Sequence, residues 1–485
     1  MSNAAVMQTP LCALTGILRS LRLAFNDFFA FGRSLRLTLS ICGGMLLWES
    51  SAGRSLLNRK AIMVPQRVTS PLMTPGIPLR IVATALVPFA IGYLLSYLLR
   101  AVNAVVAPDL IADFSLTPAE IGLLTSAYLL AFALFQLPLG VLFDRYGPRR
   151  VQTALLMLAA AGCVIFAWAP GVMTLFLARA VVGLGFAGGL MSGFKASSLW
   201  VPLERRTLVN ACIMSTGALG IIAATEPTAH LVREVGWRNA FLIYAGLIAL
   251  SAGLIFLVVP RRDGEPVAAH FGQQFGQLLR IMRLPLYWRL APLLGLTTGV
   301  QIGIQTLWAG PWFRDVLGFD RMQVARHLLW MAIAFMVGIL SSGFAVDRLG
   351  RRGISPLTVM VAYLLVYLVA QTVIILQLPD LTVLAWLVVA ATGQVGIVAF
   401  PWFAAQVGNE LAGRSNASLN FAMFMSAFMV QGAIGVIIGF FTPTVTGYAP
   451  QAYSWAFGFF LVLQMLALGW YLKPMPEKEI AYGRS

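Results

Sequence analysis

Polar residues follow one face of the first long apolar stretch of the chain, separated by steps of three or four residues, as on one side of a helix. They are Tyr93, Ser96, Tyr97, Arg100 and Asn103. An arginine within a membrane helix costs about 2.5–3.5 kcal/mol on insertion scales, so such residues usually have a function. A guanidinium beside hydroxyl and amide groups is suited to bind an anion. We predict that Arg100, Tyr93, Tyr97 and Asn103 bind substrate. Alternatively, Arg100 extends toward water near Pro108.

Further polar residues lie in the seventh and tenth apolar stretches. Thr297, Gln301 and Gln305 recur at four-residue intervals, and Gln394 lies between two glycines. We predict that Gln301, Gln305 and Gln394 also bind substrate. The alternative is that these residues form hydrogen bonds between helices, as Gln and Thr commonly do in membranes. In the fourth stretch, Arg179 and Lys195 lie near opposite ends, where both could reach water.

Glu226 is the main carboxylate of the fifth apolar stretch and lies beside Pro227. A carboxyl group of this kind could take up and release a proton during transport if burial raises its proton affinity. It is therefore the candidate for proton coupling, with a solvated helix-end residue as the alternative. His230 and His327 are weaker candidates for a proton relay.

The rest of the chain explains why these residues are conspicuous. Of 485 residues, 59% are hydrophobic and 11% charged, whereas soluble domains contain about 25% charged residues. This composition excludes a soluble enzyme. Twelve apolar runs are each long enough to cross a membrane. They lie near 81–107, 117–139, 151–169, 172–195, 207–229, 237–260, 287–310, 323–345, 354–377, 380–405, 416–441 and 452–472. We predict an all-α membrane protein with twelve transmembrane helices in two six-helix bundles.

The net charge of +16 is distributed in short arginine clusters between the apolar runs. This is the pattern of cytoplasmic loops under the positive-inside rule, not the continuous patch expected of a nucleic-acid binder. We therefore expect a multi-pass protein of the plasma (bacterial inner) membrane with both termini in the cytoplasm. The four cysteines lack the spacing of metal ligands, and we predict no metal or cofactor. No nucleophile–base set indicates an enzyme.

The distribution of apolar, polar and charged residues along the chain predicts five segments. Residues 76–260 and 287–475 form the two bundles, 261–286 is a cytoplasmic linker, and 476–485 is a cytoplasmic tail. Residues 1–75 are a basic extension, either disordered or translated from an upstream start, with Met63 or Met73 as the alternative beginning.

A loop after the second apolar run is repeated after the eighth, with Gly, Asp, Arg and Gly at the same spacing. The two copies contain Gly140, Asp144, Arg145, Gly147, Arg149 and Arg150, and Gly343, Asp347, Arg348, Gly350 and Arg351. Such repeats indicate duplicated halves. We expect the first glycine of each copy to permit close helix approach. We expect each Asp to begin the next helix, where a carboxylate is favoured by about 0.3–1 kcal/mol, and to pair across the bundle interface as a gate. The alternative is that each Asp only caps a helix and that the arginines only set the membrane topology.

The first copy closely matches the signature G-x-L-x-D-R-x-G-R-R, and the chain resembles the major facilitator superfamily on this evidence. The resemblance implies two six-helix bundles around a central cavity that opens alternately to each side. Gly92, Tyr93, Tyr97, Arg100 and Pro108 resemble the first helix of the sugar-phosphate permease and organic anion–cation symporter branch. That likeness implies that Arg100 binds the anionic group of a substrate. The second arginine of the organophosphate antiporters would fall near Gly303, so a carboxylate fits better than a phosphate.

These features predict a secondary active transporter of a small organic anion, functional as a monomer and coupled to protons or to a counter-anion. Two other functions stay open. One is proton-coupled efflux of drugs or metabolites, although the segment 217–224 lacks the proline of the drug antiporter motif. The other is a membrane solute sensor that transports nothing.

Overall fold

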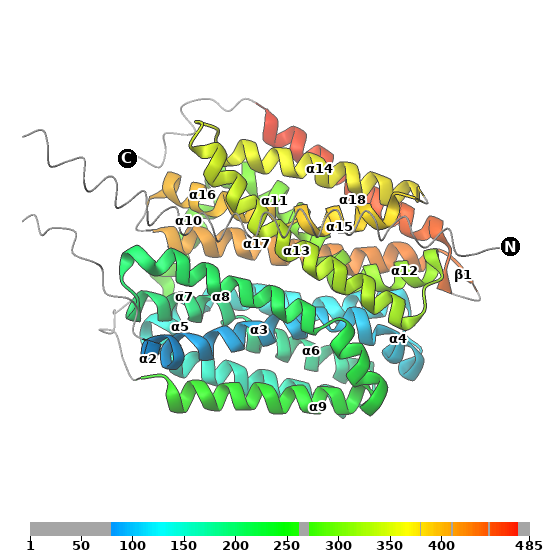
Figure 1. Cartoon of the computed structure of the whole chain (residues 1–485), viewed down its shortest axis with the longest axis horizontal. Coiled ribbons are helices and arrows are strands. Elements are labelled where there is room, and N and C mark those ends of the chain that lie inside the picture. The colour runs from blue at the N-terminus through cyan, green and yellow to red at the C-terminus, as the bar shows by residue number, and fades with distance from the viewer. Residues whose placement is uncertain (1–78, 261–270, 379, 409–410, 445–446, 474–485) are drawn as a thin grey trace, which may run out of the picture. The chain divides into compact units, whose positions relative to one another are not determined.

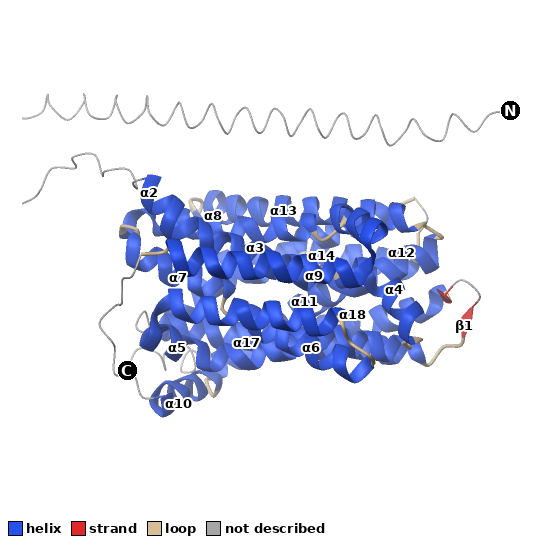
Figure 2. Cartoon of the chain, turned by 90° about the horizontal axis from the view of Figure 1, so that it is seen from below, coloured by secondary structure: helices blue, strands red, loops and turns tan. Residues whose placement is uncertain are grey.

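The computed structural model describes residues 79–260, 271–378, 380–408, 411–444 and 447–473 (Figure 1). The predicted extension over 1–75, the tail over 476–485 and residues 261–270 of the predicted linker lie outside these ranges. The described chain is almost entirely helical, as Figure 2 shows.

The first half of the chain contains the following elements. They are α2 (Leu79–Ile81), a π-helical turn (Val82–Leu86), α3 (Val87–Ala101), α4 (Asn103–Phe114), α5 (Pro118–Ala167), α6 (Val172–Phe186), α7 (Gly189–Trp200), α8 (Leu203–Ala223) and α9 (Glu226–Val258).

The second half begins with a short helix of the predicted linker. Its elements are α10 (Phe271–Met282), α11 (Pro285–Gly303), a π-helical turn (Ile304–Trp308), α12 (Ala309–Leu317), α13 (Arg321–Gly350), α14 (Pro356–Leu376), α15 (Thr382–Thr392), a 3₁₀ turn (Val395–Val398), α16 (Ala399–Val407), α17 (Ala412–Gly439), β1 (Pro443–Thr444), β2 (Gly447–Tyr448) and α18 (Pro450–Leu472). The two short strands pair antiparallel.

The described part of the chain supplies twelve membrane crossings. Within the described residues, ten helices are long and apolar enough to span a bilayer. One of them, α5, is two helices that meet at Gly147, where φ is 75°, and α8 supplies one more crossing with an apolar segment over Cys212–Ala223. The predicted fold class is therefore confirmed.

Local sequence signals explain where several helices begin and bend. At the start of α5, the Thr117 hydroxyl accepts a hydrogen bond from Glu120 N at 3.3 Å, and the Glu120 carboxylate accepts one from Thr117 N at 2.9 Å. This capping box satisfies two backbone donors. The fifth crossing is interrupted at Thr225, between α8 and α9, and Pro227 lies in the first turn of α9, where a backbone donor is not needed. The tenth crossing loosens into a 3₁₀ turn at Val395–Val398, just before Pro401.

The two halves lie side by side (Figure 1), with α5 packed against α17, α8 against α13, and α4 against α12. We call the end of the bundle where α5 passes Asp144 the motif end, and the end that carries Asp109 and Arg321 the far end. At the far end the halves approach closely. A Cβ atom at Gly122 would lie 3.0 Å from Gln431 O and 3.4 Å from the Cα of Gly435.

Candidate functional site

A cavity of about 980 Å³ lies between the two halves and is lined by both. Its wall includes Arg100 and Phe132 from the first half and Gln305 and Phe424 from the second. Toward the motif end the wall includes Asp144, whose side chain is 34% exposed. The cavity therefore reaches solvent at the motif end, whereas the close approach of the halves covers it at the far end.

Arg100 lies in this cavity wall with its side chain buried, 6% exposed. Its Cζ atom is 4.4 Å from the centre of the Tyr97 ring, 4.9 Å from Phe132 and 4.8 Å from Phe424. Its Nε atom has no hydrogen-bond partner, and no described residue forms an ion pair with it. The alternative in which Arg100 extends to the membrane surface is thus wrong. A buried, uncompensated cation is available to an anion in the cavity.

The other members of the predicted stripe divide into two groups. Tyr93 and Tyr97 line the cavity, with their rings edge to face at 5.0 Å between centroids. Asn103 is buried but is not part of the cavity wall. The helix is interrupted at Val102, between α3 and α4, and three-residue steps also drift around a helix of 3.6 residues per turn. The prediction that Asn103 contacts substrate is therefore not supported by its position.

The predicted glutamines also differ in position. Gln305 and Gln394 line the cavity, whereas Gln301 lies behind Gln305 and donates to its Oε1 at 2.9 Å. The α11 face toward the cavity carries Thr298 and Ile302 instead of Thr297 and Gln301. The π-helical turn that begins at Ile304 shifts the helix register, so a strict four-residue count does not follow the cavity face. Gln301 therefore hydrogen-bonds within its own membrane crossing, and its observed partner does not lie on a neighbouring helix.

Among the described residues, neither Asp of the repeated loop forms an ion pair across the halves. Asp144 accepts from Lys195 Nζ at 2.7 Å, within the first half, and Asp347 pairs with Arg351 of its own helix end at 2.9 Å. Both Asp residues lie in the last turns of α5's first segment and α13, so the prediction that they begin the next helix is wrong. The preceding helix continues until Gly147 in one copy and Gly350 in the other.

The remaining loop residues surround the same end. Arg149 donates to Phe256 O at the end of α9, and its Cζ lies 5.0 Å from the Phe256 ring. Arg145 lies 5.3 Å from the Tyr146 ring. Four further loop residues lie exposed at the motif end of α5 and α13: Arg150, Gly343, Arg348 and Gly350. A Cβ atom at Gly140 or Gly343 would meet nothing within 4 Å. The expected close approach at these glycines is wrong here because the motif end is open.

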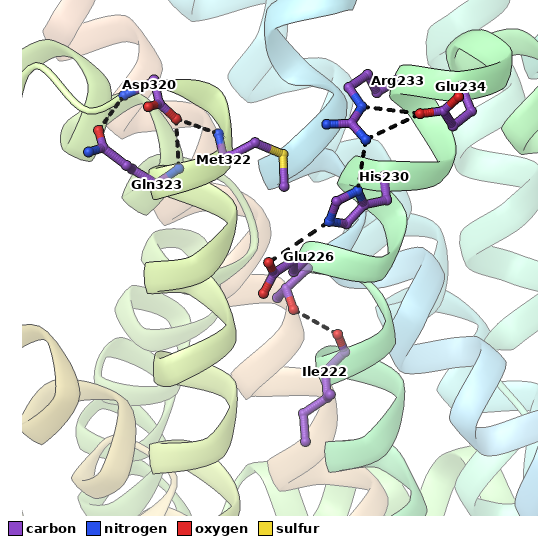
Figure 3. Close-up of polar contacts among 9 residues, drawn as sticks. Ile222, Glu226, His230, Arg233, Glu234, Asp320, Met322 and Gln323 are labelled. Carbon is purple, nitrogen blue, oxygen red and sulfur yellow. Dashed lines mark hydrogen bonds and ion pairs between the residues drawn. The ribbon is translucent and has the colours of Figure 1, made fainter. Parts of the chain in front are cut away.

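Glu226 is the first residue of α9, directly after the break at Thr225 (Figure 3). Its carboxylate is 27% exposed and 3.9 Å from His230 Nε2, and His230 Nδ1 lies 3.2 Å from Arg233. Figure 3 shows this group facing the start of α13, where the Asp320 carboxylate caps the helix. Glu226 is not part of the cavity wall.

Two features that connect the halves are not predicted by the sequence. At the far end, Arg321 donates to both carboxylate oxygens of Asp109, at 2.6 and 3.0 Å. Phe132 and Phe424 approach each other at 4.3 Å between ring centroids, beside Arg100. Neither feature has a local signal, because each joins residues from different halves. Arg179 is also unexpected: its side chain is 1% exposed and donates to Leu99 O at 3.1 Å, so it does not reach water.

A second polar contact at the far end lies within the first half. Asp113 in α4 accepts from Trp237 Nε1 at 3.0 Å and from Arg238 at 2.6 Å. The Trp237 hydrogen bond and then the Arg238 contact hold the pKa of Asp113 below its ordinary value.

The fold and cavity define a polytopic membrane protein of two helical halves. Residues 89–436 match the family model of the Major Facilitator Superfamily. The chain belongs to this superfamily, and the resemblance predicted from the repeated loop is confirmed.

Three relatives illustrate the range of similarity. The probable sulfoacetate transporter SauU of Cupriavidus necator is 24% identical over 274 residues, which are 54% of this chain and 64% of that protein. The niacin transporter NiaP of Acinetobacter baylyi is 26% identical over 295 residues, 54% of this chain and 66% of that protein. The aligned part thus covers less than two thirds of either relative. A bacterial homologue of the human lysosomal transporter Spinster, in an inward-facing and unoccupied conformation, has a TM-score of 0.63 at 18% identity over 82% of this chain and 97% of that one. This likeness concerns the fold.

Proposed function

We propose that the protein is a secondary active transporter that carries a small organic anion across the membrane by alternating access. The observation that carries this proposal is Arg100, a buried cation without a carboxylate partner among the described residues, in a cavity between two packed halves. A bound anion would supply the missing partner. Movement of the halves about the anion would then expose it at either end.

The arrangement favours a carboxylate over a phosphate. A doubly charged phosphate is usually held by several cations or donors. Here Gly303, the position that resemblance assigns to a second arginine, packs against Gln431. Arg100 offers a planar fork that matches a single carboxylate.

We place the motif end in the cytoplasm of a plasma (bacterial inner) membrane, with both termini there, because the arginine clusters lie at that end. In this orientation the described conformation is inward-open. Import of an anion would be opposed by about 2.3 kcal/mol per charge per 100 mV. Proton symport or exchange against a counter-anion would offset this cost, with Glu226 as the coupling candidate and the monomer as the working unit.

The test is transport by purified protein in proteoliposomes, with the Arg100→Gln and Arg100→Lys variants. Loss of a buried charged partner costs about 2–5 kcal/mol, so Arg100→Gln should lower anion uptake by at least about thirtyfold. The matched control is Arg289→Gln, because Arg289 lies 6.0 Å from the Tyr471 ring and outside the cavity wall. Normal uptake by Arg100→Gln would refute the site. Binding without flux in the unmodified protein would instead indicate a sensor.

A further inference from the structure

We propose that the transported anion is a monocarboxylate with an apolar, ring-sized body, such as an aromatic acid, and not a polyhydroxylated or doubly charged acid. The inference rests on the proposed function and concerns the chemistry of the cavity around Arg100. Three observations carry it: the distribution of charge, the rings around the guanidinium, and the prior engagement of the polar wall groups.

Charge in the cavity wall is concentrated on one deep cation. The charged wall residues are Arg100, Asp144, Lys195 and Arg414. Asp144 and Lys195 neutralise each other at 2.7 Å. Asp144 is twelve residues beyond Phe132 on α5, about 18 Å at 1.5 Å per residue, and Arg414 is ten residues before Phe424 on α17, about 15 Å. A ligand carboxylate at Arg100 therefore has no second cation of the cavity wall within the length of a small molecule, because the nearby Arg179 is buried outside the wall, where it donates to Leu99 O.

Aromatic rings surround that cation from both halves. The Arg100 Cζ atom lies within 5 Å of the Tyr97, Phe132 and Phe424 ring centres and 5.9 Å from the Tyr128 ring. Arg100 is only 6% exposed among these rings, so an ion pair with a carboxylate would form in surroundings less polar than water and be strengthened. They also form the surface next to the bound carboxylate. An apolar body attached to that carboxylate would be buried against rings, whereas a sugar-acid chain would lose its hydration there.

Several polar wall groups already have partners inside the protein. Gln136 Nε2 donates to Ala187 O at 3.0 Å, and the Thr306 hydroxyl donates to Ile302 O at 2.7 Å. Gln305 Oε1 accepts from Gln301. The buried Gln305 Nε2 has no partner, so it can donate to a carboxylate oxygen beside Arg100. Hydroxyl groups of a polyol chain against the rings would find the engaged groups unavailable, and each buried unpaired hydroxyl weakens binding by about tenfold.

The experiment uses the unmodified protein and compares small anions and one neutral analogue as ligands. Binding is measured by the thermal shift of the protein in detergent. Transport is measured as uptake of radiolabelled phenylacetate into proteoliposomes, with unlabelled gluconate, succinate and phenylacetamide as competitors. We expect phenylacetate to bind and to be transported. Gluconate and succinate should compete at least about tenfold more weakly, and the neutral phenylacetamide should not compete.

Ring variants test the contribution of the aromatic wall. Phe424→Leu and Phe132→Leu keep apolar volume but remove a ring beside Arg100, and should weaken phenylacetate binding by about 3- to 30-fold, the range of cation–π contacts from exposed to desolvated sites. The effect on hexanoate should be smaller, because hexanoate has no ring to stack. Phe459→Leu is the control, since that side chain is 52% exposed on the outer surface of the helices.

The outcomes separate this inference from the proposed function. Arg100-dependent uptake that prefers gluconate or succinate, or ring variants that change nothing, would overturn the apolar monocarboxylate and leave anion transport standing. Failure of every anion to bind or move would overturn both. Uptake of phenylacetate that survives Arg100→Gln would refute the site on which both rest.

Discussion

The two ends of the helical bundle hold their halves by different means. At the far end, contacts cross between the halves: glycines of α5 and α17 face each other, and Arg321 of α13 pairs with Asp109 of α4. At the motif end, the ion pairs of Asp144 and Asp347 stay within their own halves, and the cavity reaches solvent. One end is held by cross-half packing and charge, and the other leaves its charges free to change partners. This difference indicates that the far-end contacts determine which conformation is populated.

The largest effect is expected from breaking the close packing at the far end. A leucine at Gly435 would overlap the Pro118 backbone and lie 3.1 Å from the Trp308 ring even at its Cβ. Overpacking costs about 1–3 kcal/mol, and the cost applies only while the far end is closed. Gly435→Leu should therefore shift the conformational equilibrium by about 5- to 150-fold toward far-end opening.

The measurement is the distance between spin labels on Ala112 and Arg326, exposed residues of the two halves at the far end. We expect a longer distance in Gly435→Leu. The matched control is Gly439→Leu, one turn further along α17, where a Cβ atom meets nothing within 4 Å. Equal distances in the two variants would mean that helix packing does not hold the far end.

A smaller effect is expected from the cross-half ion pair. Asp109 and Arg321 are 24% and 38% exposed, so their pairing contributes about 0.2–1 kcal/mol. Arg321→Ala should change the ratio of far-end-open to far-end-closed molecules, measured by the same spin labels, by at most about fivefold. The exchanged pair Asp109→Arg with Arg321→Asp should restore it.

Asp347→Ala sharpens this comparison, because it removes an ion pair of similar length that lies within one helix end. It should leave the far-end distance unchanged. A shift as large as that of Arg321→Ala would show that the motif-end pair also controls closure of the far end.

The smallest effect is expected from Asp113, whose contacts lie at the far end but within one half. Its folded pKa is lowered by Trp237 and Arg238, so the stabilisation is fully present above the ordinary pKa of about 3.9. It is lost as the pH falls through the lowered folded value. The unfolding temperature in detergent should fall less steeply between pH 6 and pH 3 for Asp113→Asn than for the unmodified protein. A parallel pH dependence would contradict this, and spin-label distances should not change in either case.

Much of the fold followed from local sequence patterns. The start of α5 is encoded locally by Thr117 and Glu120, three residues apart, which form its capping box. The twelve crossings agree with the apolar runs because a bilayer requires about 20 apolar residues for each helix. Within the site, Arg100 and Gln394 were found because a polar residue in an apolar run is conspicuous.

The errors arose where three-dimensional register departs from a simple count. Asn103 and Gln301 were assigned to the cavity by three- and four-residue spacing, but a break at Val102 and the π-helical turn after Gly303 change which face points inward. Asp144 was assigned to a helix start because the following Gly147 was treated as part of a loop, whereas the helix continues to that glycine.

By itself, the sequence determined the number of crossings, the duplication of the halves and the presence of a cation among apolar residues. Those properties depend on the length of apolar runs and on residue types at short spacing, which are local. Only the tertiary structure decided that Phe132 and Phe424 enclose Arg100 and that Asp109 meets Arg321, residues that are 212 positions apart. Contacts between halves depend on how two separately formed bundles pack, and no local pattern encodes that packing.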